Sequence, residues 1–490
     1  MKSARHAAVF CTALSFFART GPAETAVNPQ IVKMAGEISE DRIKAIIEKL
    51  VSFGTRNTMS DATDPAHGVG AARQWILQQF QSYSPKLQVR FEKFRVKKQG
   101  QRIFRDVDLY NVIAVLPGKT MPETEVWITG HYDSLNLGNR PPAAQTENPS
   151  ASGRGAGDNP LSATQNMTPA DFEKNAALPA PGACDDGSGT AAVMELARVM
   201  SQYEFDKTLV FAAFAGEEQG LIGSSLQAAK AHKENEGIEA VLNNDIIGTD
   251  RSGNGRFGNT SLSVYSDETM DSPSQQLSRY VREMGERYLP SMRVDTVFMG
   301  DRLGRGGDHT PFQWEGYAAV RLSTPNEIYA NQHRATDLLE NMSVPYTAQV
   351  TRINGVVAAS LALSPKAPNV MRAPAPPRAW EKTDGAAPPP PRRPTPMISR
   401  GKSGYDALLQ WKPAGPDTAI KGYVIVMRPT TSPYWEQEIY VGKVTEYLMK
   451  DVSIDDLKFG VKAIGADGGE SLVAPYVYPP RAKTEIQTVQ

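Results

Sequence analysis

The amino-acid sequence predicts an α/β fold, a mixed and mostly parallel sheet with helices on both faces, followed by a small all-β sandwich at the C-terminus. Three observations lead to this prediction. Short apolar runs alternate with stretches of helical spacing over most of the chain, short strand-like runs fill its end, and a Pro-rich stretch separates the two parts. Alternating strands and helices are typical of a sheet with helices on both faces. Several short strands in succession favour a sandwich.

The expected elements of the α/β part follow from apolar periodicity. Helical spacing appears at residues 38–52 and again from Gly70. Strand-like alternation follows at residues 89–96, and residues 111–118 are the end of a buried strand. Four later apolar runs have the length and composition of buried parallel strands: VWIT, LVFAAF, EAVLN and AAVRL. Further helices are expected at residues 190–202, 224–230, 272–288 and 346–363. We expect these segments to form one domain over residues 29–366.

Three stretches of biased composition mark the boundaries of this organisation. Residues 134–180 are rich in Pro, Gly, Asn and Ser, which predicts a long surface insertion, either a spacer or a lid. Residues 373–397 are Pro-rich and predict a semi-rigid linker. Residues 398–480 then contain short strand-like runs with turns between them, and their Trp, Tyr and Gly pattern resembles a fibronectin type III module. Such a module is a candidate for contact with a polymer or a surface.

Composition limits the classes of function. The chain has 490 residues, a net charge of −1, 40% hydrophobic residues and 22% charged residues, as expected for a globular protein of more than one domain. No basic field indicates a nucleic-acid partner. No apolar stretch reaches the roughly 20 residues of a membrane-spanning helix.

The N-terminus has the layout of a secretory signal peptide over residues 1–23. Lys2 and Arg5 precede an apolar stretch, and Gly21, Pro22 and Ala23 follow it. A secreted or periplasmic protein is therefore expected, the alternative being a disordered leader without a role in export. Removal of the leader would leave Cys184 as the one cysteine, so no internal disulfide is expected.

Five segments carry side chains suited to metal binding, and four of them follow the apolar runs. The expected ligands are His131, Asp185, Glu218, Asp245 and His333. Ligands in open α/β sheets bind beyond the carboxyl ends of the strands, so these side chains should converge on one crevice. A carboxylate such as Asp185 can bridge two cations about 3.5–4 Å apart. Nitrogen and oxygen donors suit two Zn²⁺ ions, although cobalt or manganese could substitute.

Neighbouring residues supply further candidates. Glu217 and Glu218 would repel each other at a buried strand end without cations, so we expect Glu218 to bind metal and Glu217 to act as general base. Asp133 is placed to orient His131. His309 is a candidate for contact with substrate. Asp186 and Ser188 are expected to cap a helix. Cys184 is expected to be a small buried residue. The other histidines, His6, His67 and His232, are expected to be exposed.

The order of these motifs resembles peptidase family M28, the cocatalytic zinc peptidases. The motifs are H-x-D, D-D-G-S-G, G-E-E, N-D-I-I-G and H-x-x-x-D, and the resemblance extends from about Ile38 to about Leu363. It implies a phosphorylase/hydrolase-like fold in which Asp185 bridges the zincs. Glu218 and His333 would complete one position, and His131 and Asp245 the other. The resemblance also implies that Glu217 is the base, that Asp133 orients His131, that His309 lies near the site without binding metal, and that the peptide bond after Asp185 is cis.

Two departures from the family pattern stand out. The spacing from His131 to Asp185 is longer than usual, which would alter access to the pocket. Gln332 occupies a position where several members have a tyrosine that stabilises the oxyanion, so another donor is needed for that role.

The resemblance implies an exported dinuclear zinc exopeptidase that acts on peptides, most members of the family being aminopeptidases. The alternatives are another activity of the family, such as carboxypeptidase or glutaminyl cyclase, and a non-catalytic binding protein. Cyclases of related fold use one zinc, and binding proteins on this fold have lost ligands, whereas all five are present here.

Overall fold

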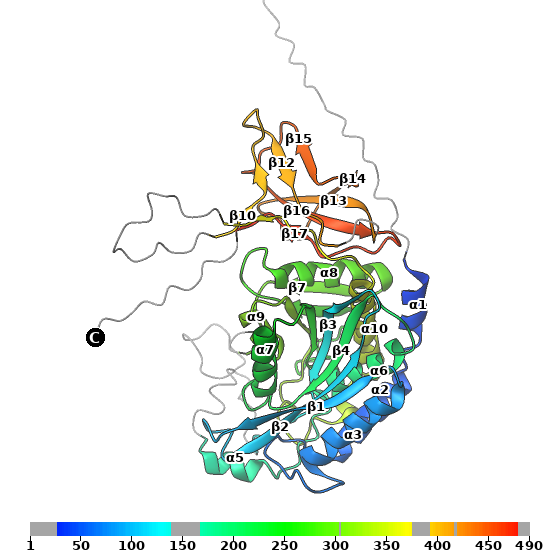
Figure 1. Cartoon of the computed structure of the whole chain (residues 1–490). Coiled ribbons are helices and arrows are strands. Elements are labelled where there is room, and N and C mark those ends of the chain that lie inside the picture. Colours follow the sequence, from blue (N-terminus) through cyan, green and yellow to red (C-terminus); the bar gives the residue numbers. More distant parts are fainter. Residues whose placement is uncertain (1–26, 139–166, 303–304, 375–392, 416–418, 479–490) are drawn as a thin grey trace, which may run out of the picture.

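The computed structural model describes residues 27–138, 167–302, 305–374, 393–415 and 419–478 (Figure 1). The expected signal peptide at residues 1–23 lies outside the described residues. So do most of the 134–180 insertion and most of the 373–397 linker.

The α/β domain is built on an eight-stranded mixed sheet. The strands are, in spatial order, β1 (Gln88–Val96), β2 (Val107–Leu116), β4 (Lys207–Phe214), β3 (Met121–His131), β5 (Ile238–Asn244), β8 (Ala319–Ser323), β6 (Ser261–Tyr265) and β7 (Arg293–Val297). The four central strands, β4, β3, β5 and β8, run parallel to one another. The antiparallel pairs β1–β2, β2–β4 and β6–β8 lie outside this centre. The carboxyl ends of the central strands therefore meet at one edge of the sheet.

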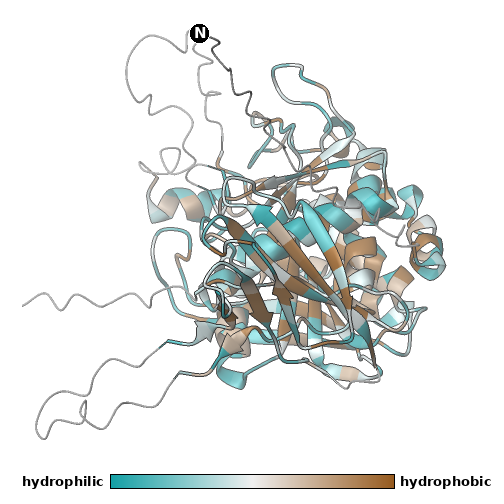
Figure 2. Cartoon of the chain, turned by 90° about the horizontal axis from the view of Figure 1, so that it is seen from above, coloured by the Kyte–Doolittle hydropathy of each residue, from teal (hydrophilic) through white to brown (hydrophobic). Residues whose placement is uncertain are grey.

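Helices cover both faces of the sheet, as predicted. One face packs against α1 (Pro29–Gly36), α2 (Glu40–Ser52), α3 (Gly68–Tyr83), α6 (Gly187–Met200), α8 (Pro273–Tyr288) and α10 (Val344–Ala362). The other face packs against α7 (Ile222–Glu234) and α9 (His309–Trp314) (Figure 1). Strand β4 shows why: Phe211 faces the first set of helices, whereas its neighbours Val210 and Ala212 face the second, because side chains alternate along a strand. The central strands are apolar, as expected for a sheet buried on both faces (Figure 2).

Two short helices belong to the connections of this domain. Helix α5 (Pro169–Asn175) lies in the described part of the insertion, and the 3-10 helix η1 (Leu339–Asn341) precedes α10. No helix in the described part of the chain is both long and apolar enough to cross a membrane.

The C-terminal module consists of antiparallel sheets, which confirms its all-β class. One sheet has the order β11 (Ile398–Ser399), β12 (Ala407–Gln410), β15 (Glu446–Met449), and the other has the order β14 (Gln437–Gly442), β13 (Ile420–Pro429), β16 (Leu457–Gly465), β17 (Ala474–Pro475). A small pair, β9 (Met371–Arg372) and β10 (Thr395–Pro396), precedes them. Trp411, Tyr423 and Val461 lie in an apolar core separate from that of the α/β domain. The fibronectin type III identity of the module stays a prediction.

Buried ion pairs join the C-terminal module to helix α8 and the residues just before it; we call this contact the module interface. Arg428 on β13 contacts both carboxylate oxygens of Asp271 at 2.8 Å, and Arg279 on α8 contacts the same carboxylate at 3.1 Å. Lys462 on β16 lies 3.3 Å from Glu283 of α8. The module therefore packs directly on the sheet's helical layer (Figure 1).

Candidate metal centre

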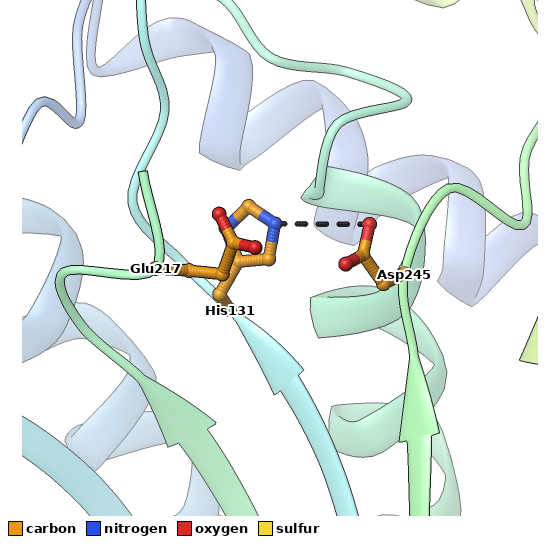
Figure 3. Close-up of side chains that lie close together, drawn as sticks. All are labelled: His131, Glu217 and Asp245. Carbon is orange, nitrogen blue, oxygen red and sulfur yellow. Dashed lines mark ion pairs between the residues drawn. The ribbon is translucent and has the colours of Figure 1, made fainter. Parts of the chain in front are cut away.

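Three of the five expected ligands lie where central strands end. His131 is the last residue of β3, Asp245 directly follows β5, and Glu217 and Glu218 lie in the turn after β4. Figure 3 shows His131, Glu217 and Asp245 pointing toward one another beyond these strands. Parallel neighbours end at the same edge, so the sheet itself brings these side chains together.

Asp185 comes from the turn that precedes helix α6. The peptide bond from Asp185 to Asp186 is cis, as the resemblance implied. The Asp186 side chain caps α6 by accepting a hydrogen bond from the Gly189 amide, and it also accepts hydrogen bonds from the amides of His131 and Ile246. Asp186 thus ties the turn to the ends of β3 and β5, which leaves Asp185 free to face the crevice.

His333 reaches the same crevice from the loop between β8 and α10. Its φ is 54°, and Ile246, the residue after Asp245, has a φ of 57°. The left-handed region is unfavourable for residues other than glycine, and most of all for a β-branched one. Backbone strain of this kind concentrates at functional sites. His333 therefore adopts, and Asp245 directly precedes, a backbone conformation that only a specific tertiary structure maintains.

The five side chains form two overlapping groups that share Asp185. One oxygen of Asp185, Oδ1, lies 3.3 Å from His131 Nε2, and the other, Oδ2, lies 3.1 Å from His333 Nε2. Asp245 Oδ1 lies 3.9 Å from His131 Nε2, and Glu218 Oε2 lies 3.0 Å from His333 Nε2. Each histidine therefore faces one oxygen of Asp185 and one further carboxylate.

Glu217 lies beside this arrangement. Its carboxylate, His131 and Asp245 offer ligand atoms within 4.8 Å of one another, as do His131, Asp185 and Glu218. Glu217 is half-buried, however, whereas Glu218 is 3% exposed. The two neighbouring glutamates diverge, so that Glu218 is enclosed between the histidines and Glu217 is accessible from the crevice.

The donor set fits divalent cations. Within the described part of the chain, His131 Nε2 and Glu218 Oε1 are buried and have no hydrogen-bond partner. Burial disfavours protonation of His131 and His333, yet the carboxylates facing them prevail and raise both pKa values, that of His333 to about 10. Burial also raises the pKa of Glu218. A buried excess of carboxylates with unpartnered donor atoms is stabilised by cations.

Asp133 organises the site from behind the expected ligands. Its backbone carbonyl lies 3.1 Å from His131 Nδ1, and its Oδ1 lies 3.6 Å from the same nitrogen, so Nε2 is directed into the crevice. The Asp133 carboxylate also accepts hydrogen bonds from the backbone amides of Glu217 and Glu218, each at 3.3 Å. Asp133 therefore connects the end of β3 with the glutamate turn, a contact that the sequence did not predict.

Two more buried charged residues hold the Asp185 turn. Asp337 accepts hydrogen bonds from the amides of Cys184 and Asp185, at 2.9 and 3.0 Å. Arg56 is fully buried and donates to the carbonyls of Tyr132, Leu50, Pro181 and Gly182. Asp337 is the last residue of the H-x-x-x-D motif, whereas Arg56 lies outside the motifs given above, and no local pattern revealed what either side chain contacts.

The remaining candidates lie as follows. His309 is fully buried, and its Nε2 lies 2.6 Å from the Gly300 carbonyl oxygen, so the geometry gives it a contact with a loop, and contact with substrate stays a prediction. Cys184 is buried, and burial raises the pKa of its thiol. The side chains of His67 and His232 are more than 60% exposed, and His6 lies outside the described residues.

A small cavity that is open to solvent lies beside the shared carboxylate. Gln332, which precedes His333, donates a hydrogen bond to Asp185 Oδ2 at 3.1 Å and lines this cavity. The other lining residues are Cys184, Asp185, Ile246, Thr249, Glu327, Ile328, Asn331, Asp337 and Asn341. A ligand in this cavity would therefore lie next to the expected metals.

The chain is similar to known proteins over most of its length. The model of peptidase family M28 matches residues 111–358. A probable zinc metalloprotease of Pyricularia oryzae is 34% identical over 471 residues, which are 89% of this chain and 82% of that protein. Another, of Leptosphaeria maculans, is 32% identical over 94% of this chain and 99% of its own length.

Solved structures with a similar fold include the LapA aminopeptidase of Legionella pneumophila, with a TM-score of 0.48, 19% identity and coverage of 69% of this chain and 76% of that one. A glutaminyl cyclase of Porphyromonas gingivalis has a TM-score of 0.48 and 16% identity, covering 66% of this chain and 98% of that one.

Proposed function

The chain belongs to peptidase family M28 and is a zinc metalloprotease, and from this premise we propose that it is a dinuclear zinc aminopeptidase with Glu217 as general base. The observation that supports two metals is the position of Asp185, whose two oxygens face two different histidines. A bridging carboxylate between two such groups is what a two-metal site requires.

In the proposed site, His131 and Asp245 would hold one zinc, His333 and Glu218 would hold the other, and Asp185 would contribute to both. Zinc bound there would activate a water molecule and polarise the carbonyl of the scissile peptide bond. Asp133 keeps the His131 imidazole oriented through its contacts to Nδ1.

Glu217 moves the proton in this scheme. Its carboxylate accepts a proton from the attacking water and passes it to the nitrogen of the leaving amine. Burial raises the pKa of Glu217 well above its usual range, and Glu218 adds to this effect. A carboxylate with a raised pKa is a stronger base, so it takes a proton from water more readily than an ordinary carboxylate does.

The charges around the cavity favour a substrate N-terminus over a C-terminal carboxylate. Recognition of a carboxylate needs an available cation, but Arg302 and Arg305 both pair with Glu327, and Arg321 pairs with Asp245 and Asp301. The described residues that line the cavity include the acidic Asp185, Glu327 and Asp337 and no basic residue, which suits an ammonium group. This argument supports an aminopeptidase over a carboxypeptidase.

A comparison of two variants tests the division of labour between the neighbouring glutamates. Glu217→Gln keeps the size of the side chain but cannot accept a proton, so kcat should fall roughly 10²–10⁴-fold while both zincs stay bound. Glu218→Ala removes a ligand, so one zinc should be lost or much weakened. Metal analysis and steady-state rates on both variants and the wild type make the comparison. Near-normal kcat in Glu217→Gln, or loss of zinc from that variant, would contradict the assignment.

A substrate panel separates the alternatives. The proposal expects hydrolysis of free aminoacyl substrates and no hydrolysis of N-blocked peptides. Cleavage from the C-terminus would identify a carboxypeptidase, and cyclisation of an N-terminal glutamine with one zinc per chain would identify a glutaminyl cyclase. If the protein binds two zincs but turns over no substrate, the remaining alternative is a non-catalytic binding protein.

We also propose that the protein is exported, on the basis of the N-terminal residues 1–23. N-terminal sequencing of the mature protein tests this, and retention of Met1 in the mature protein would contradict it. We propose as well that the C-terminal module binds a polymer or a surface. Co-sedimentation of the full chain with insoluble polymers tests this.

A further inference from the structure

A buried arginine lies directly behind one of the proposed zinc ligands. Arg321 is on β8 and is 1% exposed. Its Nη2 donates to Asp245 Oδ1 at 2.9 Å, and its Nη1 donates to Asp301 Oδ2 at 2.5 Å and to the Gly306 carbonyl at 2.9 Å. The guanidinium group therefore spans the distance between the metal centre and the loop that follows β7.

The sheet register explains why this side chain reaches Asp245. Strand β8 runs parallel to β5, and Arg321 pairs with Asn243, two residues before Asp245. An arginine side chain is long enough to extend past the end of its strand, and its planar fork can bond two acceptors in fixed directions. A lysine at the same place would offer a single ammonium group and could not reproduce that geometry.

The oxygen that Arg321 holds is also the one that faces the metal position. Asp245 Oδ1 lies 2.9 Å from Arg321 Nη2 and 3.9 Å from His131 Nε2. A hydrogen bond to this oxygen fixes the rotation of the carboxylate relative to His131. Asp301 in turn fixes the arginine, because its carboxylate accepts from Arg321 and pairs with Arg302 at 3.2 Å.

The other proposed zinc position has no such support. Within the described part of the chain, no lysine or arginine side chain forms an ion pair with the Glu218 carboxylate. Arg102 donates to the backbone carbonyl of Glu218, not to its side chain. The two halves of the centre thus differ: Asp245 is held by a buried cation, and Glu218 is held by His333 and by the turn that carries it.

We propose that Arg321 is a positioning residue that orients Asp245 and thereby maintains zinc affinity at the His131–Asp245 position alone. The inference rests on the proposed dinuclear function. The proposal extends that function, because the zinc position at His131 and Asp245 then depends on Arg321 and the position at His333 and Glu218 does not. Groups that orient a ligand typically contribute 10–100-fold to metal affinity.

The test measures zinc affinity, not turnover. Metal-free wild type and Arg321→Gln are titrated with zinc against a competing chelator, and two dissociation constants are resolved for each. Arg321→Gln should weaken one zinc about 10–100-fold and leave the other within a factor of two or so. Asp245→Asn should weaken the same zinc, and Glu218→Ala should weaken the other.

Two further variants control for charge and for folding. Arg321→Lys keeps the positive charge but not the fork, so it should also weaken that zinc. Arg293→Gln removes an exposed arginine of β7, whose side chain is 68% exposed and pairs with Asp295, and should change neither constant. If Arg321→Gln fails to fold, Asp301→Asn removes the partner of Arg321 without touching Asp245 and should weaken the same zinc by a smaller factor.

Several results would overturn the inference. The first is unchanged zinc affinity in both Arg321→Gln and Asp301→Asn, and the second is equal loss of both zincs from Arg321→Gln. The third is tighter zinc binding in Arg321→Gln, which is expected if the arginine only offsets the charge of Asp245. Fewer than two zincs in the wild type would instead remove the proposed dinuclear function.

Discussion

The module interface offers a stability prediction that can be worked out from its contacts. Asp271 lies between Arg428 of the C-terminal module and Arg279 of α8, and its side chain has no exposed surface. Both arginine side chains are at most 7% exposed. The substitution Asp271→Asn keeps the shape of the side chain and tolerates the φ of 56° at this position, because asparagine adopts the left-handed region readily. It therefore keeps the backbone and the shape of the side chain, while it removes the charge and replaces one of the two accepting oxygens with an NH2 donor.

The expected loss is large because two cations stay buried without their partner. Removal of one partner of a buried ion pair typically costs about 3–5 kcal/mol. Arginine cannot escape by losing its proton, because a guanidinium group stays protonated in proteins. We therefore expect a loss of about 3–5 kcal/mol in the free energy of unfolding at pH 7.

Urea unfolding of the zinc-loaded full chain, followed by tryptophan fluorescence, measures this loss. Trp435 reports on the interface, since its Nε1 donates to Gln276 and its ring lies near Arg279 and Arg428. The slope increases with chain length above the roughly 1–3 kcal/mol per M of small proteins, so the midpoint should fall by roughly 1 M. Asp295→Asn, which removes a 41% exposed partner from a surface pair, is the matched control and should cost about 0–1 kcal/mol. Equal midpoints for the two variants would refute the reasoning.

Three further predictions follow from the structure. Truncation after residue 366 should leave measurable peptidase activity, because the proposed site lies before residue 338. It should lower the urea midpoint, because Asp271 and Glu283 lose their partners in the module. An unchanged midpoint would show that the module interface contributes nothing to stability. Burial lowers the pKa of His309 to about 4, below that of the unfolded chain near 6.5, so its contribution to stability is complete above pH 6.5 and is lost as the pH falls toward 4. The free energy of unfolding, measured by urea titration between pH 7 and 4, should therefore fall by about 3 kcal/mol less in His309→Gln than in the wild type. Parallel pH profiles of the two proteins would contradict this. Arg56→Lys should lower zinc affinity, measured by chelator competition, because lysine cannot reproduce the fork that bonds the carbonyls of Pro181 and Gly182 just before the Asp185 turn. Unchanged affinity would show that the turn keeps its conformation without Arg56.

The ligand pattern could be predicted because it is local in sequence. His131, Glu218 and Asp245 each follow an apolar run within four residues, and parallel strands end at one edge, so the runs alone place these side chains together. The short strands β6 and β7 were not predicted, since five residues of mixed polarity carry too little periodicity to stand out from a loop.

The contacts that orient the ligands could not be predicted from local pattern. Arg321 is a charged residue inside the apolar run AAVRL, which indicates that a buried partner is needed. Nothing in the run identifies that partner as Asp245 or Asp301. Packing of the module on α8 depends in the same way on pairs such as Asp271 and Arg428, 157 residues apart. Charge pairing between distant segments is a property of the tertiary structure, and periodicity carries no information about it.

The central claim is that Asp185 bridges two zinc ions. The most direct test is a crystal structure of the zinc-loaded protein with anomalous diffraction recorded on both sides of the zinc absorption edge. We predict two zinc peaks about 3.5–4 Å apart on either side of the Asp185 carboxylate, one next to His131 and Asp245 and the other next to His333 and Glu218. A single peak, or a zinc that does not contact Asp185, would contradict the account.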